Sequence, residues 1–251
     1  MARNVLQIAR NVGSVVGIRD FSTLVNNAAP HVSAILTLMN VGCDILAQMR
    51  GTSNQGWIVL NREFTFETRP GVEAYPFPED YQELIDGTLW DRDTFREMRG
   101  PLSPTEWQRI KSGLVETTSI APNFRLRRDS LGTGKAFFVD PVPGGTETLV
   151  LEYVSNYWCV NADGDTFRGE IAADTDRPLF DHTLVYLDTL WRFKQSRGLS
   201  FASELAEFET ERDRRFAKDA GMRTIYLGKK RQPLFRGQVP EAGFGGVNPF
   251  G

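Results

Sequence analysis

The spacing of hydrophobic residues changes twice along this chain, and this change limits the possible folds more than any other feature. Near both ends the apolar residues recur every three or four positions, whereas in the middle they recur every second position. The first spacing predicts helices with one buried face, and the second predicts strands with one buried face. We therefore expect helices over 1–50 and 178–220 and a β-rich region over 57–175. The expected fold class is α+β, with a helical bundle from both ends of the chain and an inserted small antiparallel β domain.

The N-terminal region is expected to hold three helices. One contains Val5 to Val12, a short one follows the cap residue Asp20, and a long one runs from Pro30 to Arg50. The long helix carries two apolar stripes. The first consists of Val32, Ile35, Leu36, Met39, Cys43 and Leu46, and the second of Leu38, Val41, Ile45 and Met49. A helix that is apolar over this width must be covered by other helices or by a neighbouring subunit.

Spacing of period two in the middle of the chain predicts four strands. Every second residue between 58 and 67 is predominantly apolar, and further strands are expected at 123–127, 136–139 and 148–158. Because short turn-rich segments join the last three, we expect them to pair as an antiparallel meander. The stretch 86–101 has no clean period and is expected to be an ordered loop.

Local signals place the remaining helices. Ser103, with Pro104 after it and Glu106 three positions on, is typical of a capped helix start and predicts a helix over 104–112. Two longer helices are expected over 181–197 and 200–219. They are separated by a short glycine-containing segment, so we expect them to form an αα-hairpin.

The C-terminal segment, residues 221–251, differs from the rest of the chain. It contains seven glycines and three prolines, so no regular element is expected, yet apolar and aromatic residues occur throughout it. Five basic residues and one acidic residue give it a net charge of +4; the whole chain carries −3, so residues 1–220 carry −7. We expect a compact body over 1–220 and an extended arm over 221–251 that lies along another surface.

Two groups of residues are candidates for contacts with neighbouring molecules. In the arm they combine aromatic rings with positive charge: Tyr226, Lys229, Lys230, Arg231, Phe235, Arg236, Phe244 and Phe250. In the body they are the aromatic and charged residues Trp90, Asp91, Arg92 and Trp107. Charged neighbours of this kind are typical of ion pairs at a surface or between subunits.

The sequence predicts no catalytic, cofactor or metal site. The segment 132–135 lacks the first glycine and the following hydroxyl of a phosphate-binding loop, so a hairpin turn is expected there. The segment 161–165 begins like a calcium loop, but Thr166 and Ala172 stand where that loop needs glycine and glutamate. A turn held by Asx side chains is expected instead.

Few residues are candidates for catalysis by a nucleophile or by an acid–base pair. The two histidines, His31 and His182, both lie at expected helix starts, where a histidine is commonly a polar helix-end residue. A small hydrolase that uses Asp86 and Asp91 beside Trp90 stays open as an alternative, although ion pairing accounts for these carboxylates equally well.

Composition excludes several classes of protein. Hydrophobic residues make up 41% and charged residues 24%, and the net charge of −3 argues against a protein that binds nucleic acid over its whole surface. The two isolated cysteines, Cys43 and Cys159, indicate neither a disulfide framework nor a zinc site and are expected to be buried. No run approaches the roughly 18 uninterrupted apolar residues of a membrane span, and the N-terminus is too polar for a signal peptide. We expect a protein made in the cytoplasm, with no membrane partner.

A series of short segments occurs in a recognisable order. They are DILA at 44–47, REFTF at 62–66, YPFPEDY at 75–81, IDGTLWDR at 85–92, GPLSPTEW at 100–107, LEYVSNYW at 151–158, LWRF at 190–193 and RGL at 197–199. This order resembles the adaptor proteins of tailed bacteriophages, which connect head to tail, and the resemblance covers roughly residues 3–220.

The resemblance implies a structural protein of the virion neck and no enzymatic activity. Such proteins form a ring, here expected to be a dodecamer, that docks on the portal protein and offers its other face to the tail nozzle or another tail protein. Genomic DNA passes through the lumen without sequence-specific binding. An acidic body suits this passage, because a basic lumen would hold phosphates electrostatically. By the same analogy the arm would run up the portal or across neighbouring subunits.

Two further alternatives stay open beside the hydrolase. One is a different neck or tail component, such as a stopper or nozzle subunit. The other is a DNA-binding module that works through the basic arm, for which salt-dependent binding to duplex DNA is the expected signature.

Overall fold

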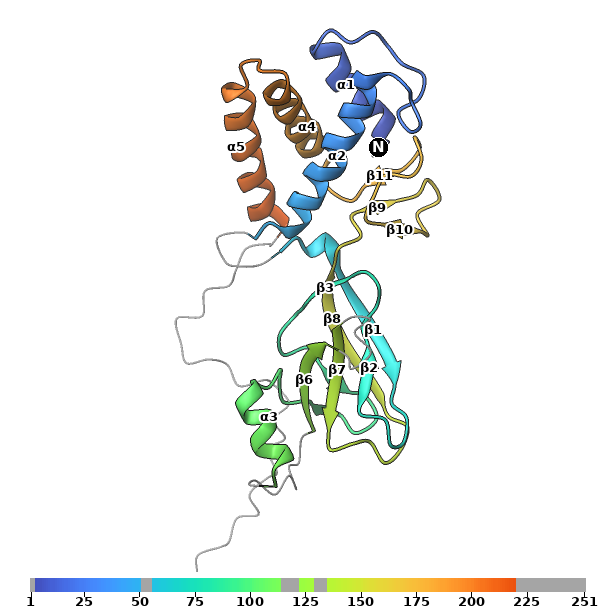
Figure 1. The fold of residues 1–251 in the computed structure, drawn as a ribbon, viewed down its shortest axis with the longest axis vertical. Coiled ribbons are helices and arrows are strands. Elements are labelled where there is room, and N and C mark those ends of the chain that lie inside the picture. Colours follow the sequence, from blue (N-terminus) through green and yellow to red (C-terminus); the bar gives the residue numbers. More distant parts are fainter. Residues whose placement is uncertain (1–2, 51–55, 114–121, 129–134, 220–251) are drawn as a thin grey trace, which may run out of the picture. The chain divides into compact units, whose positions relative to one another are not determined.

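The computed structural model describes residues 3–50, 56–113, 122–128 and 135–219 (Figure 1). All of them belong to one unit, Met1–Ala220, by contacts between Cα atoms. The helices are α1 (Val5–Val15), α2 (Pro30–Gln48), α3 (Pro104–Lys111), α4 (His182–Ser196) and α5 (Ala202–Asp219). The strands are β1 (Asn61–Glu67), β2 (Ala74–Pro76), β3 (Tyr81–Leu84), β4 (Trp90–Asp91), β5 (Arg96–Glu97), β6 (Asn123–Arg128), β7 (Lys135–Asp140), β8 (Thr148–Ser155), β9 (Cys159–Val160), β10 (Phe167–Arg168) and β11 (Arg177–Pro178). Helices together with antiparallel sheets confirm the α+β class.

Helix α4 is central to the helical region, because it contacts α1, α2 and α5, and Figure 1 shows it between α2 and α5. The helix starts follow local sequence signals: Pro30 occupies the first turn of α2, and the Asp181 side chain accepts from the backbone N–H of Thr183 at 2.9 Å. The helices expected at 30–50, 104–112, 181–197 and 200–219 are confirmed to within about two residues at each end.

A close approach between α2 and α4 occurs at Gly42. A side chain at this position would collide with the carboxylate of Asp188, which is 1% exposed. That carboxylate accepts from Trp191 Nε1 at 3.1 Å and from Arg192 Nε at 2.9 Å. Burial raises the pKa of Asp188, and the Arg192 guanidinium opposes the rise. The absence of a side chain at Gly42 therefore lets α2 pack directly over the buried Asp188 carboxylate, whose hydrogen bonds lie within α4.

The strands form three antiparallel sheets, ordered β1-β8-β4-β5 with β3 also on β8, then β2-β7-β6, then β10-β9-β11. The antiparallel pairing of β6 with β7 in the expected meander is confirmed, but the pairing of β7 with β8 was wrong, because these two strands lie in different sheets. The physical reason is that both strands are apolar on both faces and almost fully buried. Strand β7 pairs with β2 as well as with its sequence neighbour β6, and β8 pairs with the earlier strands β1, β3 and β4.

The first two sheets enclose one hydrophobic core. It contains Phe64 and Phe66 from β1, Tyr75 from β2, Phe124 from β6, Phe137 and Val139 from β7, and Leu149, Leu151 and Tyr153 from β8. The face of β7 that points away from this core contacts helix α3, where Trp107 packs with Ala136 and Phe138. The inserted β region is thus a small sandwich with one helix on its outside.

Three further expectations need correction. The short helix after Asp20 does not form, because the backbone N–H groups of Leu24 and Val25 donate to Asp174 at 3.0 and 2.7 Å instead of to helical carbonyls. The strand expected from residue 58 begins at Asn61, after a 3-10 turn over Ile58–Leu60. The segment expected to be an ordered loop, 86–101, contains β4 and β5, which extend the first sheet beside β8.

Helix α2 is strongly apolar along its length. By length and composition it could cross a membrane, a test that the core helix of a soluble protein also passes. Its inner face packs against α4 and α1.

Candidate interaction surfaces

The two apolar stripes predicted on α2 have different surroundings. In the first, five residues are each at most 2% exposed and belong to the helical core, namely Val32, Ile35, Met39, Cys43 and Leu46, while Leu36 is half-buried against that core. The second is called here the outer stripe and consists of Leu38, Val41, Ile45 and Met49. Val41 is 44% exposed and Ile45 37%, while the other two are half-buried. The described part of the chain therefore covers one stripe and leaves much of the other on its surface.

A second exposed apolar group lies on the turn between β4 and β5, called here the Phe95 hairpin (residues 90–97). Trp90 pairs with Glu97 and Asp91 with Arg96, so four residues form the loop. Phe95 is the last of the four, and its side chain is 83% exposed. Its φ is +55°, in the left-handed region that glycine and asparagine favour. The turn thus places a large apolar ring in water on a backbone conformation unfavourable for phenylalanine.

The buried carboxylate of Asp91 fixes this turn. It is 2% exposed and accepts from the backbone N–H groups of Asp93 at 2.9 Å and Thr94 at 3.1 Å, and also from the Thr94 hydroxyl. Asp93 in turn accepts from the backbone N–H of Thr148 at 2.6 Å, which ties the loop to the start of β8. Hydrogen bonds to a charged acceptor are about twice as strong as neutral ones. The loop is therefore preorganised, and Phe95 is held in its exposed position.

The predicted contact residues of the body fall into two places. Trp90, Asp91 and Arg92 share the Phe95 hairpin, where Trp90 is half-buried and Arg92 is exposed with Glu63 3.5 Å away. Asp91 is buried and supports the turn. Trp107 belongs to α3, is 2% exposed and packs with Ala136 and Phe138 of β7, in a hydrophobic cluster that contains none of the hairpin residues. A role of these four residues in contacts between subunits stays a prediction. Within the subunit, Asp91 holds the hairpin turn and Trp107 packs in a hydrophobic cluster.

Phe95, the most exposed large apolar side chain in the described residues, is not among the predicted contact residues. Asp91, Asp93 and Thr94 are residues that commonly stabilise tight turns through their side chains, and this signal was available. The left-handed conformation of Phe95 follows from the pairing of β4 with β5, which the sequence pattern does not reveal.

The predicted arm residues lie outside the described part of the structure. They are Tyr226, Lys229, Lys230, Arg231, Phe235, Arg236, Phe244 and Phe250. The expected hairpin turn at 132–134 also lies outside it.

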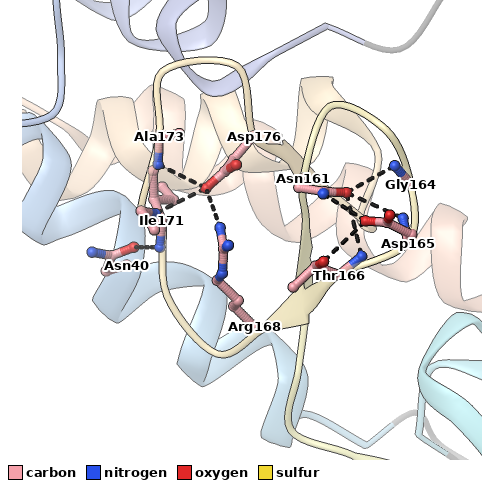
Figure 2. A network of polar contacts seen from close by, with 10 residues as sticks. Asn40, Asn161, Gly164, Asp165, Thr166, Arg168, Ile171, Ala173 and Asp176 are labelled. Atoms are coloured by element: carbon pink, nitrogen blue, oxygen red, sulfur yellow. Dashed lines mark hydrogen bonds and ion pairs between the residues drawn. The ribbon is translucent and has the colours of Figure 1, made fainter.

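Side-chain oxygens in the segment 161–176 accept hydrogen bonds that hold its loops, as Figure 2 shows. Asn161 Oδ1 accepts from the backbone N–H groups of Gly164 at 2.8 Å and Asp165 at 3.1 Å, which confirms the predicted Asx turn. Asp176 is 1% exposed and accepts from the N–H groups of Ala172 and Ala173, with Arg168 at 3.8 Å. The side chains of Asn161 and Asp176 thus each hold a loop through backbone N–H groups, the latter through Oδ2 alone.

The two histidines and the two cysteines lie in surroundings that suit a structural role. His31 and His182 lie in the first turns of α2 and α4, as expected, and Arg197 approaches His31 Nδ1 at 3.1 Å. Cys43 and Cys159 are free and buried, as predicted. Burial raises the pKa of both thiols, that of Cys159 to about 12, so neither is a thiolate near neutral pH. Across the described ranges no group of three or more His, Cys, Asp or Glu side chains is arranged to hold a metal ion.

Comparison with known proteins gives no family. No protein-family model matches the sequence, and no curated protein matches it either.

Proposed function

We propose that this chain is a structural subunit of a homo-oligomeric ring, the head-to-tail adaptor of a tailed bacteriophage. The observation that carries the proposal is the outer stripe of α2. It lies on the same helix as a stripe that is buried except for the half-buried Leu36, yet Val41 and Ile45 remain in water in a single described subunit. Burial of apolar surface stabilises association by roughly 25 cal/mol per Å². A neighbouring copy that covered this stripe would complete the core of the helix.

The segments that resemble phage adaptors support the proposal from a second direction. Five of them coincide with β1, with β2 to β3, with β4, with the start of α3 and with β8. These are the elements that build the sandwich core and its covering helix. The resemblance therefore involves the residues that specify the β region.

On this proposal the remaining features have assigned roles. Helices α1, α2, α4 and α5 form the bundle of the adaptor body, and twelve copies form the ring. The ring docks on the portal, the arm over 221–251 holds a neighbour or the portal, and the other face meets the tail nozzle. The net charge of −7 over residues 1–220 keeps the lumen from retaining DNA.

Other functions have weaker support. A small hydrolase that pairs Asp86 with Asp91 as acid and base has weaker support, because the Asp91 carboxylate already accepts three hydrogen bonds within its own turn. A DNA-binding module would work through the basic arm, and a steep loss of duplex binding with salt would favour it. Another neck or tail component, such as a stopper, would share the exposed apolar stripe and would differ in the partner that it binds.

Electron microscopy of the purified full-length protein, alone and mixed with its portal protein, tests the proposal. We expect closed rings that stack on portal rings. The double variant Val41→Glu with Ile45→Glu should lose the rings, because it places two charges in the contact, whereas Ala202→Glu on exposed helix α5 should keep them. Rings that persist unchanged in the double variant would show that the outer stripe is not the contact, and a protein that never forms rings would contradict the function.

A further inference from the structure

The Phe95 hairpin combines two properties that are unfavourable in the isolated subunit with a buried side chain that holds them in place. Its aromatic ring is 83% exposed, its backbone has a φ of +55°, and a buried aspartate keeps the turn in that conformation. Exposed apolar rings and left-handed non-glycine residues are each unfavourable, and such features concentrate at functional sites. A rigid aromatic ring at the tip of a turn is the kind of group that anchors a protein contact.

The same chain carries an apolar depression that fits such a ring. It lies between the α1–α2 connection and the α4–α5 connection, and its apolar lining includes Val16, Ile18, Phe21, Phe193 and Leu199. Its volume is about 580 Å³, within the range of roughly 300–1,000 Å³ typical of sites for small organic groups. Leu199 at its edge is 50% exposed, so part of the apolar lining faces water in the described subunit.

The charges around the two features are complementary. Around the Phe95 hairpin the acidic residues Glu63, Asp93, Glu97 and Glu147 outnumber the basic residues Arg92 and Arg96, without counting the buried Asp91. Beside the depression the basic residues Arg10, Arg19 and Arg197 outnumber the single acidic residue Asp20, which pairs with Arg10 at 3.3 Å. Opposite net charge steers association and favours this pairing over contact between two hairpins or between two depressions.

We propose that the Phe95 hairpin of one copy inserts its aromatic ring into the apolar depression beside Leu199 of a second copy. The inference rests on the proposed homo-oligomeric function and names one of its contacts. It is a heterologous contact, since two different surfaces meet, and repetition of such a contact produces rings or open filaments.

Two single variants and their mixture test the contact in the full-length protein. Phe95→Asn removes the ring and keeps a residue that tolerates the left-handed region; Leu199→Glu places a charge at the edge of the depression. Each should weaken self-association by about 30-fold or more, measured by sedimentation velocity over a concentration series. Val142→Ala, at a residue 42% exposed outside both features, is the matched control and should associate like the wild type.

The mixture distinguishes a heterologous contact from any other. Each variant keeps one intact half, so an equimolar mixture should form a heterodimer through a single contact between the intact Phe95 of one variant and the intact depression of the other. Wild-type association of Phe95→Asn, or of Leu199→Glu, would overturn the proposal, as would a mixture without heterodimers. If rings form in both variants, the contact is wrong while the ring function stands; if the wild type is monomeric throughout, both fail.

Discussion

Two tight connections in this molecule each place a residue in the left-handed region, and they fill that position in opposite ways. The α4–α5 connection uses Gly198 at φ +68°, whereas the β4–β5 connection uses Phe95 at φ +55°. Glycine adopts this conformation freely, but a residue with a Cβ atom costs roughly 1–2 kcal/mol. The first turn suits the folding of its own chain. The second retains a side chain whose benefit lies in contact with another molecule.

Removal of the support under the Phe95 hairpin should have the largest effect. Asp91→Ala leaves the N–H groups of Asp93 and Thr94 without their buried acceptor, and we expect a loss of about 3 kcal/mol in the free energy of unfolding. This corresponds to a fall in Tm of roughly 6–12 °C in a thermal scan. Asp93→Ala, which loses one exposed bond to Thr148, should cost about 1 kcal/mol. Equal losses in the two variants would show that Asp91 has no special role.

A substitution in the other turn should have the next largest effect. Gly198→Val forces a β-branched residue into the left-handed region, and we expect a loss of about 2 kcal/mol, measured by urea unfolding. Gly144→Val is the matched control, because an added Cβ there meets no atom within 4 Å and its φ is not left-handed. A Gly198→Val protein as stable as this control would remove the basis of the comparison between the turns.

Relief of strain at Phe95 should have the opposite sign. Phe95→Asn places a residue that tolerates the left-handed region at φ +55°, so we expect about 0.5–1 kcal/mol of added stability in the isolated subunit. Phe95→Ala removes the same ring without the backbone gain and serves as the reference. The stability should be measured at a concentration where the protein is monomeric. Asparagine no more stable than alanine at this position would mean that the turn is not strained.

The smallest effect concerns charge beside the two turns. Lys194 and Glu204 form an ion pair across the α4–α5 connection, whereas Glu147 lies near Asp91 and Asp93. Burial raises the pKa of Glu147, and the charges of Asp91 and Asp93 add to the rise. When the pKa of a carboxyl is higher in the folded than in the unfolded state, the folded protein becomes less stable as the pH rises from the unfolded-state pKa through the folded-state pKa.

Glu147→Gln removes the unfavourable buried charge, so it should stabilise the protein at neutral pH. Because the side chain is partly exposed, screening limits the gain to a few tenths of a kcal/mol. The difference between variant and wild type should disappear below about pH 4, where the glutamate is protonated in both folded and unfolded states. A difference that is independent of pH would show that charge is not its cause.

Local sequence signals predicted the helices well because their causes are local. The cap at Ser103, Pro30 at the start of α2 and the spacing along α4 act within a few residues. The failures involve distant partners. Asp174 takes the N–H groups of Leu24 and Val25 from about 150 residues away along the chain, and β8 pairs with β1 rather than with β7. Neither contact can be predicted from the spacing of hydrophobic residues.

The candidate surfaces were predictable only in part. The two stripes of α2 are visible in the sequence, but which stripe its own chain covers depends on the packing of α4. The contact residues Trp90, Asp91 and Arg92 were selected for aromatic and charged character, and they surround Phe95 without including it. An exposed residue is recognised as unusual only when its backbone conformation is known.

Native mass spectrometry of the full-length protein over a concentration series tests the central claim most directly, because the account requires surfaces that another copy covers. It predicts a closed oligomer with one fixed number of copies that persists as the protein is diluted towards its dissociation constant. A protein that remains monomeric at every concentration would contradict it.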